Sequence, residues 1–373
     1  MKVLAVFGTR PEAIKMCPLV LKLREKKEIE CVVCLTGQHK EMLFQVMDAF
    51  DVEVNYNLEI MKDRQTLTKI TTSILEKIEP ILKNEKPDLV LVHGDTTTSF
   101  AAALAAFYQK IPVGHVEAGL RTGEIYSPYP EEMNRLLTDR ISTYYFAPTK
   151  QNQMNLAREG ILNNVYVTGN TVIDAFKYTV RDKYTFTSET LNDIDFSNHR
   201  VITVTAHRRE NLGTPLTNIC YAIKRIAMEY SDVIFVYPVH LNPAVRDVVY
   251  DVLKNVGNVK LIEPIDVLDM HNVLARSYMV MTDSGGLQEE APHLGKPVLV
   301  LRTETERPEA VEAGVVKVVG VDEGVIYSEA KELLDNKVAY YAMSRAVNPY
   351  GDGHASDRIV KAILCIYARL NSK

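Results

Sequence analysis

The chain has 373 residues, 46% of them hydrophobic and 24% charged, which is typical of a soluble globular protein with two domains. Its net charge of −5 gives no electrostatic reason to expect nucleic acid as a partner. No apolar run approaches the roughly 20 residues of a membrane span, and acidic and basic residues follow the first strand too closely for a signal peptide. We therefore expect a cytoplasmic protein with reduced thiols and no membrane contact.

The five cysteines form no framework of disulfide spacing. Cys31 and Cys34 make a C-x-x-C, but they lie in the strand-like run ECVVCL. Residues three apart on a strand face opposite sides, so a redox pair or a zinc site is not expected there.

The first strand is expected at residues 2–7, and Gly8 to Glu12 form a turn into a helix that ends near residue 26. Arg10 and Lys15 flank this helix start, where backbone N–H groups favour anions. The turn is not G-x-G-x-x-G, so it does not indicate a dinucleotide site.

Strands and helices then alternate through the first half of the chain. Strands are expected at 30–35, 88–92, 111–116, 143–147 and 165–168, and helices from about 38, at 66–84, after residue 95, from 130 and at 151–159. Residues 51–65 are expected to be irregular. This alternation predicts a doubly wound parallel sheet.

Three acidic residues stand at ends of these elements. Asp95 follows one apolar strand, Glu117 follows the next, and Glu131 follows Pro130, which is expected as the first residue of a helix. Asp95 could be only a helix cap, and Glu131 only a first-turn acid that suits the helix dipole. Such positions line the ligand crevice of an open α/β sheet, so together they favour acid/base chemistry.

The pattern restarts after residue 170. Strands are expected at 201–205, 233–237, 259–262, 279–282, 297–301 and 315–319, and helices at about 214–228, 243–254, 268–276 and from Leu287. This predicts two Rossmann-like domains, 1–169 and 170–353, that face a central crevice, with a last helix at 354–373 packing back on the first.

Two stretches of the second half favour phosphate. His207 and Arg208 directly follow a strand, although one arginine of this turn could belong only to a solvated loop. Ser284, Gly285 and Gly286 also follow a strand, and the glycines read as a tight turn that lets the backbone approach a diphosphate. No H-E-x-x-H or D-x-D cluster suggests a required metal ion.

Many of these stretches resemble one family, the non-hydrolysing UDP-N-acetylglucosamine 2-epimerases. The strings that carry the resemblance span the chain: FGTRPEAIKM, HGDTTT, GHVEAGLRT, YPEEMNR, TAHRREN, YPVHLNP, TDSGGLQEEAPHLGKPVLVLR, TERPEA and NPYGDG. The resemblance implies the two-domain glycosyltransferase-B architecture, a homodimer and no cofactor. The implied ligands are UDP-N-acetylglucosamine, UDP-N-acetylmannosamine and UDP.

The resemblance also implies site residues. The catalytic group would be Asp95, Glu117, Glu131 and His207. The substrate and UDP would be bound by Arg10, Lys15, Ser284, Gly285, Gly286, Glu290 and Arg307. Bacterial members of the family bind a second UDP-N-acetylglucosamine, and the matching positions are Gln38, Glu41, Arg64, Glu131, Arg208 and His240. Glu41 departs from the glutamine often found at its position.

The implied reaction fits carboxylate chemistry. The hydrogen on carbon 2 of the sugar is not adjacent to a carbonyl, and loss of UDP from carbon 1 acidifies it. Anti elimination would give UDP and 2-acetamidoglucal, and syn re-addition would give the other epimer. Asp95 is our first choice for proton transfer, with Glu117 and Glu131 on the opposite face and His207 assisting the leaving phosphate. The alternatives are a hydrolysing epimerase, a glycosyltransferase of the same architecture and a non-catalytic nucleotide-sugar sensor.

Overall fold

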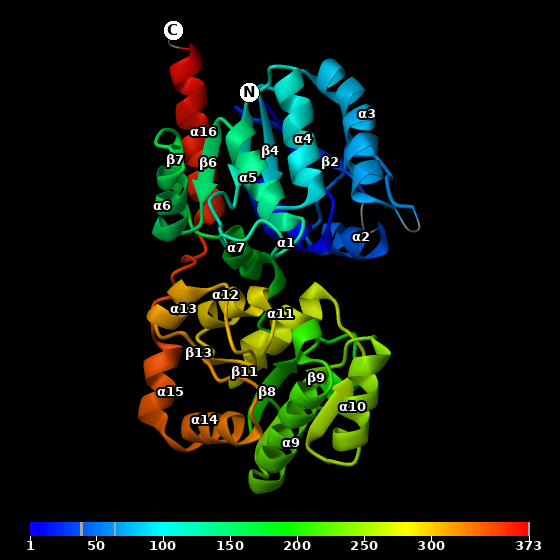
Figure 1. Ribbon diagram of the computed structural model, residues 1–373, viewed down its shortest axis with the longest axis vertical. Coiled ribbons are helices and arrows are strands. Elements are labelled where there is room, and N and C mark those ends of the chain that lie inside the picture. Colours follow the sequence, from blue (N-terminus) through cyan, green and yellow to red (C-terminus); the bar gives the residue numbers. More distant parts are fainter. Residues whose placement is uncertain (38–39, 63–64, 372–373) are drawn as a thin grey trace. The chain divides into compact units, whose positions relative to one another are not determined.

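The computed structural model describes residues 1–37, 40–62 and 65–371. The chain divides into two compact units, Met1–Tyr178 with Tyr350–Lys373, and Thr179–Pro349. Each unit is a parallel sheet flanked by helices (Figure 1). Among the described helices, none is both long enough and apolar enough to cross a membrane.

The first unit contains a sheet of seven parallel strands in the order β3-β2-β1-β4-β5-β6-β7. The strands are β1 (Lys2–Phe7), β2 (Glu30–Leu35), β3 (Tyr56–Asn57), β4 (Leu89–His93), β5 (Val113–Val116), β6 (Tyr144–Ala147) and β7 (Val165–Val167). The short strand β3 lies in a segment that was expected to be irregular. The central strands are continuous apolar runs because helices cover both faces of the sheet.

The helices of the first unit are α1 (Arg10–Arg24), α2 (Lys40–Ala49), α3 (Leu67–Glu85), α4 (Thr97–Tyr108), α5 (Glu131–Ile141), α6 (Lys150–Arg158), α7 (Thr171–Thr179) and α16 (Ala355–Asn371). On one face α4 lies between α3 and α5, and its buried alanines allow close packing (Figure 1). On the other face α1 contacts both α2 and α16.

The first unit extends past the boundary predicted at residue 169. Helix α7 belongs to it, and Asp174 of α7 accepts hydrogen bonds from the backbone N–H groups of Ala355 and Ser356 at 3.1 and 2.8 Å. These bonds satisfy otherwise unpaired donors at the start of α16. They tie the start of α16 to the first unit, to which the chain returns at Tyr350.

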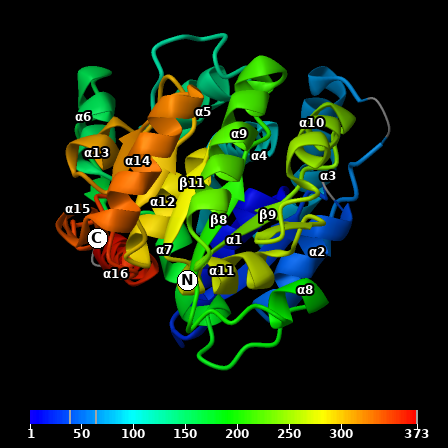
Figure 2. The ribbon, with the colours of Figure 1, turned by 90° about the horizontal axis from the view of Figure 1, so that it is seen from below.

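The second unit contains six parallel strands in the order β10-β9-β8-β11-β12-β13. They are β8 (Arg200–Thr205), β9 (Val233–Pro238), β10 (Val259–Ile262), β11 (Met279–Thr282), β12 (Val298–Val300) and β13 (Val316–Val318). The helices are α8 (Glu189–Asn192), α9 (Thr214–Glu229), α10 (Pro243–Leu253), α11 (Val267–Arg276), α12 (Gly285–His293), α13 (Pro308–Glu312), α14 (Glu323–Asp335) and α15 (Lys337–Ser344). Helix α9 lies between α14 and α10 on one face of this sheet (Figure 2).

Candidate active site

In each unit, candidate site residues follow the two neighbouring strands at which the strand order reverses. These strands are β1 and β4 in the first sheet and β8 and β11 in the second. At such a switch point the connections leave toward opposite faces of the sheet, which opens room for a ligand at the carboxyl ends of the strands. The positions of the predicted residues therefore agree with the ordinary place of a ligand in each fold.

Asp95 lies in the turn between β4 and α4. Gly94 before it has a φ of +63°, a conformation that glycine adopts without steric cost. Thr96 caps α4, because its hydroxyl accepts a hydrogen bond from the backbone N–H of Ser99 at 3.1 Å. The alternative that Asp95 is only the helix cap is therefore wrong. Its carboxylate instead pairs with the guanidinium of Arg135.

Glu117 follows β5 directly and has a φ of +66°. A positive φ is uncommon for a residue other than glycine, and its surroundings must hold it in place. The Glu117 carboxylate receives hydrogen bonds from Lys15 Nζ at 2.5 Å and from Asn170 Nδ2 at 3.0 Å. With its side chain only 12% exposed, Glu117 is an acid fixed in both backbone and side chain.

His93, the last residue of β4, lies beneath this acid. Its Nε2 is 3.7 Å from Glu117 Oε2 and has no hydrogen-bond partner within the described part of the chain. Burial lowers the pKa of His93 to about 3, even though the Glu117 carboxylate acts in the opposite direction. The ring is therefore neutral near pH 7, whereas Lys15 places a positive charge beside Glu117.

Glu131 is the first residue of α5, so Pro130 precedes the helix and does not occupy its first position as predicted. The Glu131 side chain is partly exposed, and it makes no hydrogen bond or ion pair with another described residue. A first-turn carboxylate also suits the helix dipole. The geometry leaves both interpretations of Glu131 open.

Arg135, one turn further along α5, joins two acids. Its guanidinium pairs with Asp95 and donates to Glu132 Oε2 at 2.9 Å. Glu132 is buried and accepts the backbone N–H groups of Thr122 and Gly123 at 3.1 and 3.2 Å. Arg135 thus connects Asp95 to the loop after β5, a role that the sequence did not reveal.

Glu12 is a second residue that sequence reasoning missed. It lies in the first turn of α1, which Arg10 opens, and its buried carboxylate accepts the N–H groups of Gly8 and Thr9 at 2.9 and 2.7 Å. The hydroxyl of Thr96 donates to the same carboxylate at 2.6 Å. Burial raises the pKa of Glu12, and these hydrogen bonds oppose that rise. Glu12 thereby ties the turn after β1 to the turn that carries Asp95.

His115 of β5 is fully buried and joins two parts of the site. Its Nδ1 lies 2.6 Å from Asp139 Oδ1, and its Nε2 lies 2.7 Å from the carbonyl oxygen of Gly94. Asp139 also accepts a hydrogen bond from Arg121 at 2.7 Å. Burial acts to raise the pKa of Asp139, but His115 and Arg121 outweigh it and hold that pKa below its ordinary value. A polar residue inside an apolar strand was the available signal for His115.

In the second unit, His207 and Arg208 follow β8 as expected. Their backbone N–H groups both donate to Asp283 Oδ2 at 2.7 Å, and Asn211 Nδ2 donates to the same oxygen at 3.0 Å. The His207 ring stacks on the ring of His240, with centroids 5.1 Å apart and planes inclined by 6°. Asp283, which immediately follows β11, therefore holds the loop that carries His207 and Arg208.

Helix α12 begins at Gly285, two residues earlier than predicted, and Ser284 is its N-cap residue. Gly285 and Gly286 are therefore the first turn of a helix and not a separate tight turn. A Cβ on Gly285 would lie 3.8 Å from an Arg208 nitrogen and 3.9 Å from an Arg307 nitrogen. Backbone N–H groups and two guanidinium groups thus gather at one helix start, which is the composition of an anion site.

Glu290 lies one turn further along α12. Its Oε1 is 3.1 Å from the position of a Cβ on Gly286, so a side chain there would press on this carboxylate. His271 of α11 lies behind it, with its Nε2 3.6 Å from Glu290 Oε2 and its Nδ1 2.7 Å from the hydroxyl of Thr179. Glu290 is thus placed as a hydrogen-bond acceptor beside the helix start, and His271 was not predicted.

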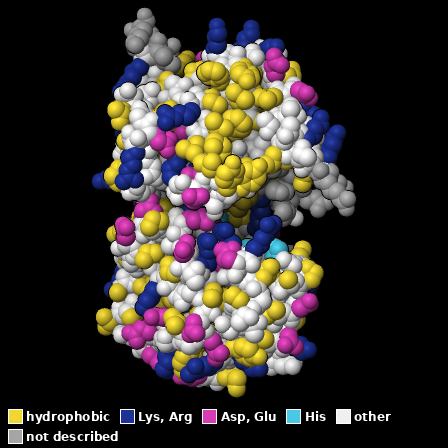
Figure 3. All heavy atoms as spheres, viewed as in Figure 1, with side chains coloured by type: hydrophobic (Ala, Val, Ile, Leu, Met, Phe, Trp, Pro, Cys, Tyr) yellow, Lys and Arg dark blue, Asp and Glu magenta, His cyan; other side chains and the backbone are white. Residues whose placement is uncertain are grey.

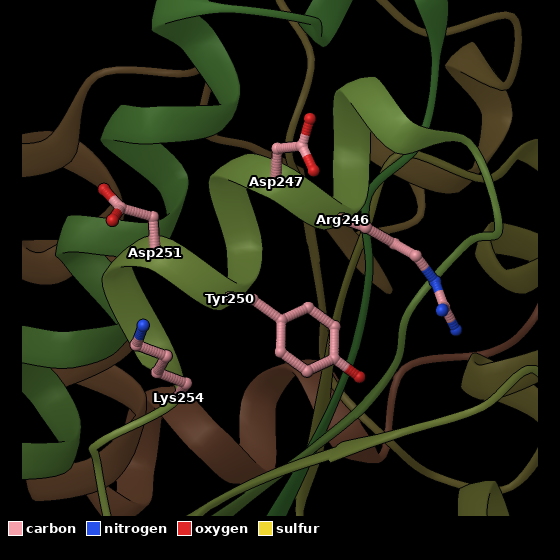
Figure 4. Close-up of a pocket in the computed structure, with 5 residues that line it drawn as sticks. All are labelled: Arg246, Asp247, Tyr250, Asp251 and Lys254. Atoms are coloured by element: carbon pink, nitrogen blue, oxygen red, sulfur yellow. The ribbon is translucent and has the colours of Figure 1, made fainter.

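The proposed second nucleotide-sugar site is described in part. Gln38 and Arg64 lie outside the described residues, and Glu41 belongs to α2. A pocket elsewhere in the second unit is lined by four residues of α10 and by the C-cap residue of that helix. They are Arg246, Asp247, Tyr250 and Asp251, with Lys254 as the C-cap (Figure 4). This pocket lies along α10.

The described residues contain no group of three or more His, Cys, Asp or Glu side chains placed to hold a metal ion. All five cysteines are free thiols. Burial raises the pKa of the Cys31 and Cys34 thiols to about 12, so neither is a reactive thiolate near pH 7.

Known proteins resemble this chain over nearly its whole length. A family model described as UDP-N-acetylglucosamine 2-epimerase matches residues 21–364. The UDP-N-acetylglucosamine 2-epimerase of Bacillus subtilis is 55% identical over 368 residues, which cover 98% of this chain and 96% of that protein.

Two solved structures share the fold of the chain. The UDP-GlcNAc 2-epimerase of Neisseria meningitidis, bound to UDP-GlcNAc, has a TM-score of 0.88 and 51% identity, covering 98% of this chain and 100% of its own. The S. aureus MnaA–UDP co-structure has a TM-score of 0.89 and 48% identity, covering 100% of this chain and 98% of its own. The chain therefore belongs to the UDP-N-acetylglucosamine 2-epimerase family, whose members are isomerases of a nucleotide sugar.

Proposed function

We propose that this enzyme interconverts UDP-N-acetylglucosamine and UDP-N-acetylmannosamine without hydrolysis, in the cytoplasm. UDP leaves carbon 1 by anti elimination, a carboxylate takes the hydrogen from carbon 2, and 2-acetamidoglucal forms. Syn re-addition of UDP, with proton delivery to the other face of carbon 2, gives the epimer. Atoms balance without a cofactor, since the proton and UDP that leave are both returned.

The observation that carries this proposal is the pair of acids after β4 and β5. Asp95 is paired with Arg135, and Glu117 with Lys15, so each acid has a cation beside it. Proton transfer needs an ionised acceptor, and re-addition needs a protonated donor. In the proposed mechanism Asp95 takes the proton, while Glu117 and Glu131 act on the opposite face and stabilise charge.

The second unit supplies the diphosphate ligands in this proposal. Arg208 and Arg307 approach the first residue of α12, and the N–H groups of Gly285 and Gly286 belong to its open first turn. Glu290 would accept hydrogen bonds from ribose hydroxyls. His207 would donate a proton or a hydrogen bond to the leaving phosphate.

The products separate this function from its alternatives. A proton spectrum of UDP-N-acetylglucosamine incubated with the enzyme should show UDP-N-acetylmannosamine and no accumulation of free N-acetylmannosamine. Stoichiometric release of free N-acetylmannosamine with UDP would establish a hydrolysing epimerase instead. An unchanged spectrum in the absence of an acceptor would favour a transferase or a sensor.

UDP alone, without magnesium, is expected to raise the melting temperature. Ligand at 100 times its Kd stabilises a folded protein by about 2.7 kcal/mol. The Ser284 side chain makes no capping hydrogen bond in the structure, so Ser284→Ala should not destabilise α12. It should remove about 1.5–3 kcal/mol of the free energy of UDP binding, the contribution of a hydrogen bond to a charged group. Arg10→Ala should also weaken the protection. Differential scanning fluorimetry measures both effects.

Arg246→Ala is the matched control, since Arg246 pairs with Glu263 beside the pocket on α10 and is not proposed to contact phosphate. Its UDP-induced shift should equal that of the parent protein. A shift that requires magnesium would contradict a diphosphate site built from N–H groups and cations alone.

We further propose that a second UDP-N-acetylglucosamine activates the enzyme through Gln38, Glu41, Arg64, Glu131, Arg208 and His240. With pure UDP-N-acetylmannosamine as substrate, turnover should begin with a lag that a trace of UDP-N-acetylglucosamine removes. Arg64→Ala should abolish this activation and keep UDP binding, as measured by initial rates and by thermal protection. Full initial turnover without a lag would contradict the regulatory site.

A homodimer is also proposed, and an exposed apolar surface supports it. Large hydrophobic side chains gather on and beside α4 and α5 of the first unit (Figure 3). They are Phe107, Tyr108, Ile125, Tyr126, Tyr129, Met133 and Leu137. Exposed apolar patches of this kind commonly mark protein contacts. Sedimentation at micromolar concentration should give twice the 42.0 kDa of one chain, and a monomer would contradict the proposal.

A further inference from the structure

Asp283 carries a buried carboxylate of which only one oxygen is fully used. The residue is 0% exposed, and its Oδ2 accepts the backbone N–H groups of His207 and Arg208 and the side-chain amide of Asn211. Its Oδ1 has no hydrogen-bond partner among the described residues. An unpaired buried carboxylate oxygen is costly, so its presence calls for a physical reason.

The free oxygen faces the ring of His207. His207 Nδ1 lies 3.6 Å from Asp283 Oδ1, slightly beyond a hydrogen bond. Hydrogen bonds among catalytic groups are often long without substrate and shorten in the complex. A small rotation of the ring would close the gap, while Oδ2 keeps the backbone of the same loop in place.

The neighbouring His240 does not accept a hydrogen bond from His207 in place of Asp283. His240 stacks against His207, and its Nδ1 accepts a hydrogen bond from the backbone N–H of Asn242 at 3.1 Å. The lone pair of His240 Nδ1 is therefore used by this N–H and does not accept from His207. His240 restrains the plane of the His207 ring without deciding which nitrogen of that ring carries a proton.

We propose that Asp283 is a positioning residue that keeps the proton of His207 on Nδ1 and thereby leaves Nε2 to act on the nucleotide sugar. The inference rests on the proposed role of His207 at the leaving phosphate. Asp283 Oδ1 accepts from Nδ1–H, so Nε2 can receive a second proton and pass it, or donate a hydrogen bond, to the phosphate oxygen. Asp283 itself touches no substrate.

The charges around His207 give the inference a pH signature. Burial lowers the pKa of His207. The neighbouring His240 and Arg208 lower this pKa further, and the Asp283 carboxylate raises it. Loss of the Asp283 charge should therefore lower this pKa. If the protonated ring is the active form, activity falls as pH rises through the pKa, and the fall should occur at lower pH in the Asp283→Asn variant.

Asp283→Asn is the informative substitution. The amide oxygen can still accept from the three donors that Oδ2 serves, while its NH₂ group faces His207 Nδ1 and makes that nitrogen an acceptor. We expect kcat to fall by about 10²–10⁴-fold, with KM and UDP-induced thermal protection close to those of the parent enzyme. Asp269→Asn is the control, since Asp269 is also buried and accepts the backbone N–H of Thr187 at 3.1 Å, but lies on α11.

A double-mutant cycle separates positioning from a purely structural role. If Asp283 acts through His207, then Asp283→Asn combined with His207→Gln should be no slower than His207→Gln alone, because coupled catalytic groups are not additive. If the fold-losses in kcat of the two single variants multiply in the double variant, the inference is overturned and the proposed function stands. Parent-like turnover of His207→Gln would instead remove the proposed role of His207 and, with it, this inference.

One measurement needs no substitution at Asp283. The ¹⁵N shifts of the His207 ring in the parent enzyme, assigned by their loss in His207→Gln, should show the neutral ring protonated on Nδ1. A neutral ring protonated on Nε2 would contradict the inference, even if Asp283→Asn failed to fold.

Discussion

Replacement of Asp95 by asparagine is expected to lower kcat by about 10²–10⁴-fold. The change keeps the size of the side chain and removes its capacity to accept a proton. Thr96 caps α4, so the loss of charge at Asp95 does not uncap the helix. The melting temperature should change little, because Asp95 is 25% exposed and Arg135 keeps its second ion pair, with Glu132 at 2.9 Å.

Asp88→Asn is the control for this experiment. Asp88 directly precedes β4 at its amino end, whereas Asp95 follows its carboxyl end. The Asp88 carboxylate accepts the backbone N–H of Lys2 at 2.7 Å. Both variants neutralise an aspartate next to the same strand, but only Asp95 lies at the proposed site. Parent-like turnover of Asp95→Asn, measured by steady-state kinetics, would make Asp95 a structural partner of Arg135.

Glu117→Gln is the second substitution with a large expected effect, a loss of about 10²-fold or more in kcat. Glutamine can accept the hydrogen bond of Asn170, but it cannot neutralise Lys15, which lies 2.5 Å from the carboxylate and is only 16% exposed. The substitution therefore removes the charge of the carboxylate that pairs with a partly buried cation, and it removes an acid from the site.

The matched control is Glu85→Gln. Glu85 pairs with Lys2 at 2.8 Å and is 15% exposed, which resembles the 12% of Glu117. It lies beside the amino end of β1, whereas the candidate site residues follow the carboxyl ends of the strands. Glu85→Gln should keep its kcat. Equal losses in the two variants would assign the effect of Glu117→Gln to stability and not to chemistry.

The alternation of strands and helices was readable because buried parallel strands leave continuous apolar runs. The bounds of β1, β2 and β11 agree with the sequence prediction to the residue. The start of α12 does not, because Gly285-Gly286 is typical of turns, and helix propensity at these positions is poor. A Cβ on Gly286 would lie 3.1 Å from Glu290 Oε1, and this crowding is seen only in the folded structure.

The candidate acids could be predicted because each follows a strand, and the end of a strand is a local signal. The residues that hold them could not, because their partners are distant in sequence. Arg135 reaches Asp95 across 40 positions, and Asp283 reaches His207 across 76. Glu12, His115 and Asp283 were visible as polar residues near apolar strands, but their partners depend on strand order, which the sequence pattern does not specify.

The central claim is elimination and re-addition at carbon 2, and deuterium oxide tests it most directly. The carboxylate that takes the hydrogen exchanges with solvent before a proton returns. Each turnover should therefore place deuterium at carbon 2 of the product and, with time, of the substrate pool. Because the glycal and UDP exist free of each other within the enzyme, traces of both should escape during long incubation. Retention of the original hydrogen at carbon 2, with neither UDP nor 2-acetamidoglucal released, would contradict the account.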